Sequence, residues 1–132
     1  MLMRAIAAGL VLLLSAGCFP NLAGDTHVET VKRLTSPSGK TDAVLEFVSG
    51  GATVGSGYVV LVGPVGFDTA RDSNRDKYIT GSFSRGKDPA VDIAWTNNTQ
   101  LTVRCAEFRD LYLNQPSLTI GKETISVDWI KN

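Results

Sequence analysis

The sequence predicts a small all-β domain, either an antiparallel sandwich or a strongly twisted meander. Beyond residue 27, short runs rich in valine, isoleucine, leucine, threonine and aromatic residues alternate with glycine, proline, asparagine and serine. No helical period of apolar residues is sustained over three turns, whereas apolar residues recur at every second position in several runs. These observations favour strands over helices through most of the chain.

Eight segments are expected to form strands because each combines strand-favouring residues with turn residues at its ends. They are Val28–Leu34, Asp42–Val48, Gly57–Val62, Tyr78–Phe83, Ala90–Trp95, Gln100–Cys105, Ser117–Ile120 and Thr124–Ile130. A helix has room only around Ala106–Leu113, where Glu107 and Asp110 interrupt a strand pattern.

The turns between these strands are explicit. Ser36–Gly39 contains a proline, which fixes φ, and a glycine, which accepts a positive φ. Asn97 and Asn98 suit a tight hairpin because asparagine tolerates the left-handed region. Asn114–Pro116 and Gly121–Lys122 are expected to close the later hairpins.

Alternation within the strands indicates how they are buried. Every second residue is large and apolar in 91–95 and again in 125–129, which is typical of antiparallel strands with one buried face. Val59–Val62 is apolar throughout, so this strand is expected to be central and covered on both sides.

The first eighteen residues have the three parts of a secretory signal peptide. Arg4 supplies a positive charge, Ala5–Ala16 is uncharged and mostly apolar, and Gly17 precedes Cys18. The apolar run is shorter than the roughly 18 to 20 residues that a transmembrane helix needs. The segment is therefore expected to be a cleaved leader rather than a permanent membrane span.

Leu13–Cys18 resembles the lipobox of bacterial lipoprotein precursors. The resemblance implies cleavage before Cys18, with diacylglycerol on its sulfur and lipid as the only attached group. Phe19 stands where inner-membrane lipoproteins of enteric bacteria usually carry Asp, which implies an outer-membrane location facing the periplasm. An ordinary exported protein with a cysteine near its new N-terminus is the alternative.

Three segments follow from this interpretation: a signal peptide at 1–17, a lipidated N-terminus and tether at 18–27, and one β-domain at 28–132. Removing 17 of the 132 residues leaves 115, the size of one domain. Thirteen Lys and Arg residues balance thirteen Asp and Glu residues, and no basic stripe indicates nucleic-acid binding.

The body also looks like a group of small, functionally uncharacterised bacterial lipoproteins. The segments that carry the resemblance are Ser36–Lys40 with Ala43–Leu45, Gly50–Thr53, Ile93–Asn98 with Leu101–Val103, and Ile125–Val127. The Ser36–Lys40 turn and the tryptophan before a turn also look like one blade of a β-propeller, but no repeat of about 40 residues is present. The resemblance implies a fold and no activity.

Residues that could support catalysis are few, so the chain is expected not to be an enzyme. His27 is the only histidine and lies at the edge of the first expected strand. Cys105 is expected to be a buried thiol, with an intermolecular disulfide or a nucleophile as alternatives. Gly39–Thr41 resembles the end of a phosphate-binding loop, but Leu34 occupies the position of its first glycine.

Two segments are candidates for the rim of a binding surface. One is a glycine cluster, in which the relevant residues are Gly50, Gly51, Gly55 and Gly57. The other places Asp72, Asn74 and Asp76 at alternate positions, as in the first half of a calcium loop. Lys77 and Phe83 replace the glycine and glutamate that such a loop requires, so no metal site is expected.

Taken together, these residues indicate a membrane-anchored periplasmic lipoprotein whose non-enzymatic β-domain binds or supports another cell-envelope component. A protein partner in the envelope is expected, and a small-molecule substrate is not. Phe67, Tyr78, Phe108 and Tyr112 are candidate contacts, although core positions suit them as well. The alternative is an inhibitor or immunity lipoprotein, which would insert a charged loop, Asp68–Lys77, into a hydrolase that attacks the envelope.

Overall fold

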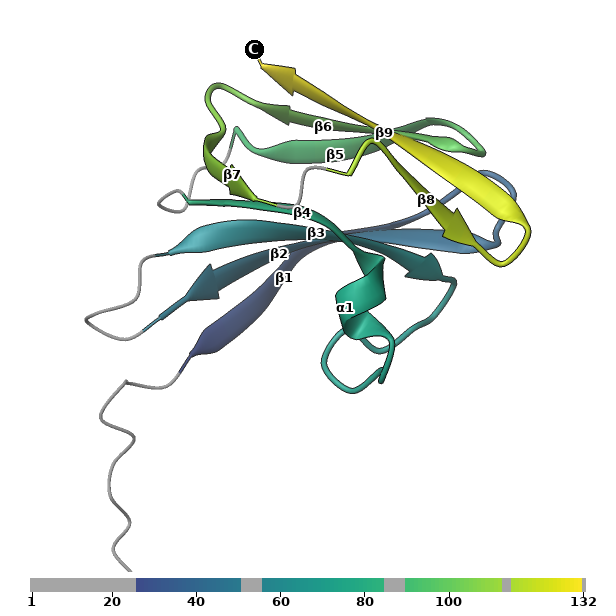
Figure 1. Ribbon diagram of the computed structural model, residues 1–132, viewed down its shortest axis with the longest axis horizontal. Helices are drawn as coiled ribbons and strands as arrows, with labels where there is room; N and C mark the ends of the chain where they lie inside the picture. The colour runs from purple at the N-terminus through teal and green to yellow at the C-terminus, as the bar shows by residue number, and fades with distance from the viewer. Residues whose placement is uncertain (1–25, 51–55, 85–89, 113–114, 132) are drawn as a thin grey trace, which may run out of the picture.

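Two β-sheets face each other in the computed structural model, as Figure 1 shows. The structure describes residues 26–50, 56–84, 90–112 and 115–131, apart from the side chains of residues 109, 110 and 112. The predicted leader with Cys18, and also Gly51 and Gly55, lie outside these ranges.

The first sheet contains five strands in the order β1-β2-β3-β4-β7, and the second contains four in the order β5-β6-β9-β8. The strands of the first sheet are β1 (His27–Thr35), β2 (Thr41–Ser49), β3 (Gly57–Pro64), β4 (Ile79–Ser84) and β7 (Arg109–Tyr112). Those of the second sheet are β5 (Asp92–Asn97), β6 (Gln100–Cys105), β8 (Ser117–Ile120) and β9 (Glu123–Lys131). A four-residue helix, α1 (Arg75–Tyr78), precedes β4.

The all-β sandwich predicted from the sequence is confirmed. Each of the eight expected strands corresponds to an observed strand, and β3 lies in the middle of its sheet. The positive φ of Gly39 confirms the expected turn at Ser36–Gly39. The buried positions in 91–95 and 125–129 also alternate as predicted.

Three local expectations are wrong. The segment around Ala106–Leu113 forms strand β7, and the short helix lies at Arg75–Tyr78 instead. Charged residues in this segment do not suit a strand inside a sheet. β7 lies at the edge of its sheet, however, where charged side chains are common because they prevent pairing with the strands of other molecules. Asn114–Pro116 does not close a hairpin, because β7 and β8 belong to different sheets.

The third error concerns strand direction, because β6 and β9 pair in parallel. Alternation of apolar and polar residues indicates that one face of a strand is buried. The alternation is the same whether the strand pairs parallel or antiparallel with its neighbour. The chain leaves β6, adds β7 to the first sheet, and returns through β8 before β9 pairs with β6. All other strand pairs are antiparallel.

The inner faces of the two sheets form one continuous apolar core. Leu45, Val60 and Val62 of the first sheet and Val103 and Ile125 of the second belong to this cluster, and each is fully buried. The sequence therefore places most of its apolar residues between two layers, which is the arrangement expected of a sandwich.

A second, smaller cluster covers the outer face of the first sheet. Val44 of β2 and Leu61 of β3 pack against Phe67, which lies in the connection between β3 and α1. A side chain at Gly63 would come within 2.9 Å of the Phe67 ring, so glycine leaves the space that this ring occupies. Together the two clusters confirm that β3 is covered on both sides, and Figure 1 shows α1 and its loop on this outer face.

Asp42 of β2 fastens the start of this connection to the sheet. Its Oδ1 accepts a hydrogen bond of 2.6 Å from the Thr35 hydroxyl, and its Oδ2 accepts bonds of 2.9 Å from Arg33 Nε and Gly66 N. Arg33 Nη2 donates to the Phe67 carbonyl at 2.6 Å, and the guanidinium lies 5.1 Å from the Phe67 ring centroid. Burial raises the pKa of the Asp42 carboxyl, but these donors and the Arg33 charge outweigh burial and hold the pKa below its ordinary value.

Glu46, also on the outer face of β2, fastens the other end of the connection. Its side chain is 2% exposed, and its Oε1 accepts a hydrogen bond of 3.0 Å from Arg75 Nη2. Arg75 Nη1 also donates to the carbonyl of Thr69. The segment 65–78 is thus held over β2 and β3 by two arginine–carboxylate pairs and by Phe67.

Asp42→Asn is expected to lower the free energy of unfolding by about 1 to 3 kcal/mol at pH 7, because buried donors lose a charged acceptor. The lowered pKa means that ionised Asp42 stabilises the folded protein fully above about pH 4 and loses this effect as pH falls through its folded-state pKa. The difference between wild type and variant should therefore shrink at acidic pH in urea denaturation experiments.

Asp92→Asn is the matched control, because Asp92 pairs with Lys32 at 2.7 Å between side chains that are 54% and 39% exposed. Its loss should stay below about 1 kcal/mol. Equal losses for the two variants would show that Asp42 has no special role.

Candidate functional site

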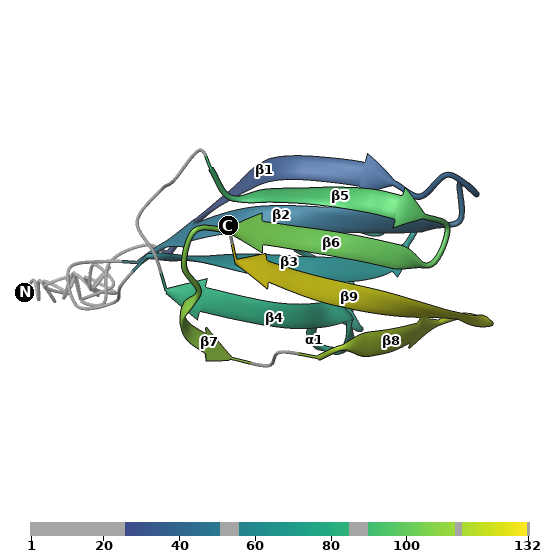
Figure 2. The ribbon, with the colours of Figure 1, turned by 90° about the horizontal axis from the view of Figure 1, so that it is seen from above.

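The sandwich has two ends along the strand direction, named here the entry end and the turn end, and different segments of the chain lie at each. At the entry end, β1 begins at His27 and β6 ends at Cys105; at the turn end lie the turns 36–40, 98–99 and 121–122. Figure 2 shows the start of β1 and the end of β6 at one side of the molecule and these turns at the opposite side. A nine-residue strand such as β1 separates the two ends by roughly 30 Å.

The turn end contains a pocket of about 320 Å³. Seven residues line it: Lys40, Thr41, Pro64, Ile120, Gly121, Lys122 and Glu123. They come from the β1–β2 turn and the start of β2, the end of β3, and the β8–β9 turn with the strand residues that flank it, so both sheets contribute to the pocket. Its volume is at the lower end of the range of about 300 to 1,000 Å³ that small-ligand sites occupy.

Local turn chemistry holds this pocket in shape. Gly39 has a φ of 76° and Gly121 a φ of 62°, and each turns the chain back within a short connection. The backbone N–H of Val65 donates to the carbonyl of Lys40 at 3.0 Å, and Thr41 lies opposite Pro64 in the β2–β3 register. The backbone of the first-sheet wall is therefore held in place by a hydrogen bond and by strand pairing.

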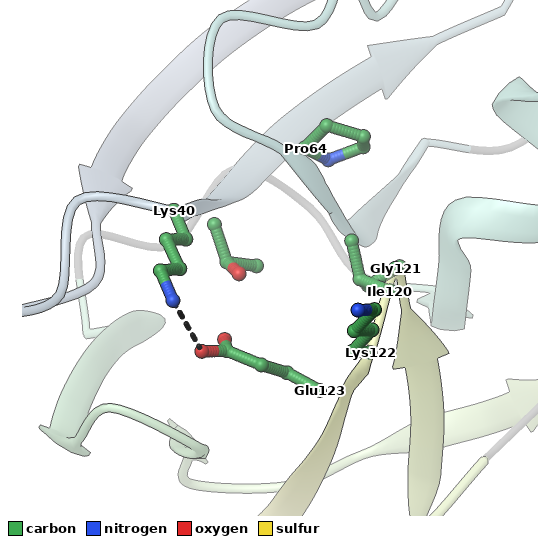
Figure 3. Close-up of a pocket in the computed structure, with 7 residues that line it drawn as sticks. Lys40, Pro64, Ile120, Gly121, Lys122 and Glu123 are labelled. Carbon is green, nitrogen blue, oxygen red and sulfur yellow. Dashed lines mark ion pairs between the residues drawn. The ribbon is translucent and has the colours of Figure 1, made fainter.

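Glu123 and Lys40 point toward each other across the pocket, as Figure 3 shows. Lys40 Nζ lies 3.9 Å from Glu123 Oε1, which is an ion-pair distance but too long for a direct hydrogen bond. The Lys40 side chain is 72% exposed and that of Glu123 only 25%. Lys122, which is exposed, adds a second positive charge to the lining.

The second oxygen of Glu123 is the most unusual atom in the pocket. Glu123 Oε2 is buried and has no hydrogen-bond partner among the described residues. Trp129 Nε1 is the other such atom in these ranges, but Trp129 packs against the core and does not line the pocket. Leaving a buried acceptor unsatisfied costs about 1 to 3 kcal/mol, and more for a charged group.

A second, smaller hollow of about 220 Å³ lies on the first sheet toward the entry end. Gly57, one of the predicted rim residues, lines it together with Val48, Ser56, Tyr58, Val59, Ser82, Phe83 and Ser84. Gly50 follows β2 and is half-buried. Because Gly51 and Gly55 lie outside the described residues, the glycine rim stays a prediction.

The other predicted rim, with Asp72, Asn74 and Asp76, lies in the segment over the outer face of the first sheet. Asp72 Oδ1 accepts a hydrogen bond of 2.8 Å from the backbone N–H of Asn74, and Asp76 is exposed in α1. Arg75, between them, pairs with Glu46. The described parts of the chain contain no group of three or more His, Cys, Asp and Glu residues placed to hold a metal.

The charged loop Asp68–Lys77 is held near both of its ends. Phe67, immediately before it, is 6% exposed, and Arg75, near its end, is tied to Glu46. Its middle turns back through hydrogen bonds from Ala70 N and Arg71 N to Asp68 Oδ1. The loop thus lies against the sheet at both of its ends.

His27 and Cys105 occupy unrelated environments. His27 is exposed at the first position of β1. Cys105 is fully buried in the core, as expected, and its Sγ lies 3.2 Å from the carbonyl of Glu107. A fully buried thiol offers no surface for a substrate or a second chain to approach. Tyr78 and Phe108 are half-buried and packed against the clusters, as is buried Phe67, while the Tyr112 side chain is outside the description.

Sequence reasoning did not identify the pocket at the turn end. It recognised Ser36–Gly39 and Gly121–Lys122 as turns, and it interpreted Lys40 and Thr41 only as part of a turn. No sequence pattern indicated that these turns meet, because their proximity depends on how the second sheet lies over the first. A lysine after a turn glycine in both segments is the only shared signal.

Comparisons with protein-family models, with curated proteins and with solved structures find no match to this chain. Within the described ranges, no helix is long and apolar enough to cross a bilayer.

Gly57→Ala is expected to destabilise the protein by about 1 to 3 kcal/mol. A Cβ at this position would lie 2.6 Å from the carbonyl oxygen of Phe83, which is backbone and moves only if β3 and β4 separate. Urea denaturation measures the change, with Ser56→Ala as the neighbouring control. If both variants unfold at the same urea concentration, close strand approach is not what requires glycine here.

Proposed function

We propose that this chain is a lipoprotein of the bacterial cell envelope, anchored through lipid on Cys18, whose β-domain binds or supports another envelope component without catalysis. The anchor rests on the charged, apolar and small-residue pattern that ends at Cys18. Several long acyl chains hold a protein to a bilayer far more firmly than one chain does. Phe19 after the cysteine favours the outer membrane, with the domain facing the periplasm.

The observation that carries the binding role is the separation of the two ends of the sandwich. Residues 18–26 span at most about 30 Å when fully extended, so the entry end would stay close to the membrane. The pocket with Lys40 and Glu123 lies at the turn end, roughly 30 Å further along the strands. An anchored domain of this kind presents its pocket away from the bilayer, where a partner can reach it.

A binding role also suits the chemistry of the described residues better than catalysis. The exposed His27 lies at the entry end, the thiol of Cys105 is in the core, and neither lines the pocket. Histidine, the most frequent general acid–base group, and the Cys105 thiol, a potential nucleophile, therefore both lie outside the pocket. The pocket instead combines two lysines and one carboxylate with apolar walls.

Cys18→Ala is expected to abolish incorporation of labelled palmitate and to release the protein from membranes in cell fractionation. The physical reason is that the diacylglycerol is attached through the thiol, which alanine lacks. A Cys105→Ala variant serves as control and should keep both the label and the membrane location. Unchanged labelling of the Cys18 variant would contradict the anchor.

A photoreactive phenylalanine analogue in place of Lys122 is expected to crosslink an envelope component in living cells, because Lys122 lines the pocket and is exposed. The same analogue in place of Arg104, which is exposed on the second sheet outside the pocket, is the control. Gel electrophoresis and mass spectrometry detect the adduct. Equal adducts at both positions, or none at Lys122, would contradict a binding role for the turn end.

A further inference from the structure

The turn end combines a cavity with apolar side chains that are exposed to solvent. Apolar atoms form most of the wall of the pocket of about 320 Å³, and Pro64 and the half-buried Ile120 belong to this wall (Figure 3). Val65 follows Pro64 and is 51% exposed. Its backbone N–H donates to the carbonyl of Lys40 at 3.0 Å, so Val65 lies beside the pocket. The pocket and its surroundings therefore suit an apolar group of a ligand.

The charges that a ligand would meet at this pocket are mainly positive. The Lys40 side chain is 72% exposed, and its Nζ lies 3.9 Å from Glu123 Oε1, beyond hydrogen-bond distance. Lys122 is exposed and makes no ion pair with any residue that the structure describes. The Glu123 side chain is only 25% exposed, its Oε2 is buried beyond the reach of a ligand, and its Oε1 faces Lys40. The exposed surface of the pocket is therefore complementary to negative groups.

The size of the pocket indicates how much of the ligand enters it. About 320 Å³ is at the lower end of the range of small-ligand sites, and it has room for one large side chain. Val65 lies outside the pocket lining, so a ligand confined to the cavity would leave this side chain uncovered. A chain segment that inserts one side chain and continues across the rim would cover both. The geometry thus favours part of a protein over a small molecule.

We propose that the turn-end pocket receives one large apolar side chain from a protein segment that carries acidic residues next to it. The apolar side chain packs on Ile120 and Pro64, and the segment covers Val65. One acidic side chain lies near Lys40 and another near Lys122, and no carboxylate has to contact both lysines. This inference rests on the proposed binding role, because it describes the partner of the same site.

Three synthetic peptides separate the apolar contribution from the charged one. The first is N-acetyl-aspartyl-leucyl-aspartyl amide, which has both features. The second replaces leucine by alanine and keeps the two acidic residues. The third keeps leucine and replaces both aspartates by lysines.

The measurement is an NMR titration of the ¹⁵N-labelled full chain in micelles of an uncharged detergent. The acidic leucyl peptide should bind with a Kd of about 1 mM or tighter and shift the amide signals of Gly121 and Lys122. The alanyl peptide should bind about tenfold more weakly, because it buries less apolar surface. The lysyl peptide should also bind about tenfold more weakly, because its charges are repelled by the pocket lysines.

Variants of the protein test the same two lysines. Lys40→Met and Lys122→Met should each weaken the acidic leucyl peptide by about threefold, and the double variant by about tenfold, because exposed ion pairs contribute little individually. The double variant Lys77→Met with Lys131→Met is the matched control, because it removes two exposed lysines outside the pocket and should leave binding unchanged. The NMR spectrum shows whether each variant is folded, and Lys122→Met alone replaces any variant that is not.

Three results would overturn the inference: no shift at the turn end with any peptide, equal binding of the leucyl and alanyl peptides, or equal binding of the acidic and basic peptides. If the Lys122 crosslink forms in cells while the peptides fail, the proposed binding role stands and only this description of the partner is wrong. If the peptides bind as expected while the crosslink is absent, the pocket keeps its assigned preference and the envelope partner is removed.

Discussion

Two carboxylates on the outer face of the first sheet, those of Asp42 and Glu46, hold the connection between β3 and β4 over that face. A buried charge is tolerated only with partners, and these two recruit Arg33 and Arg75. The arginines in turn hold the segment 65–78 against β2 and β3. Without this cover, Val44 and Leu61 would be exposed on the open side of a sheet.

This arrangement explains why a continuous apolar strand such as β3 occurs in a mostly antiparallel fold. Its inner face packs against the second sheet through Val60 and Val62, and its outer face packs under Phe67. The edges of the two sheets are joined separately, because Trp95 Nε1 donates to the carbonyl of Leu34 at 3.0 Å. The sandwich is thus closed by polar contacts at its border and apolar contacts at its centre.

Much of this fold was predictable from local patterns. Alternation in 91–95 and 125–129 indicated strands with one buried face, and the glycine of Ser36–Gly39 indicated a tight turn. The alternation of apolar and polar residues could not predict the parallel pairing of β6 with β9, because it does not depend on the relative direction of two strands. It also missed β7, because an edge strand carries charged residues that resemble a loop or helix.

The pocket was not predictable for a related reason. Lys40 and Glu123 are separated by most of the domain in sequence, and only the stacking of β8 and β9 on the first sheet brings them together. Their residue types are ordinary for exposed turns. What distinguishes the site is a buried oxygen without a donor, which is a property of three-dimensional packing alone.

The position of β9 has a consequence for how the protein is made. β9 follows every other described strand in the chain, yet it lies inside the second sheet, between β6 and β8. While a ribosome is still adding these residues, β6 has no neighbour on one side and part of the apolar layer has nothing to pack against. The second sheet is therefore complete only after β9 has been synthesised, so the sandwich closes late.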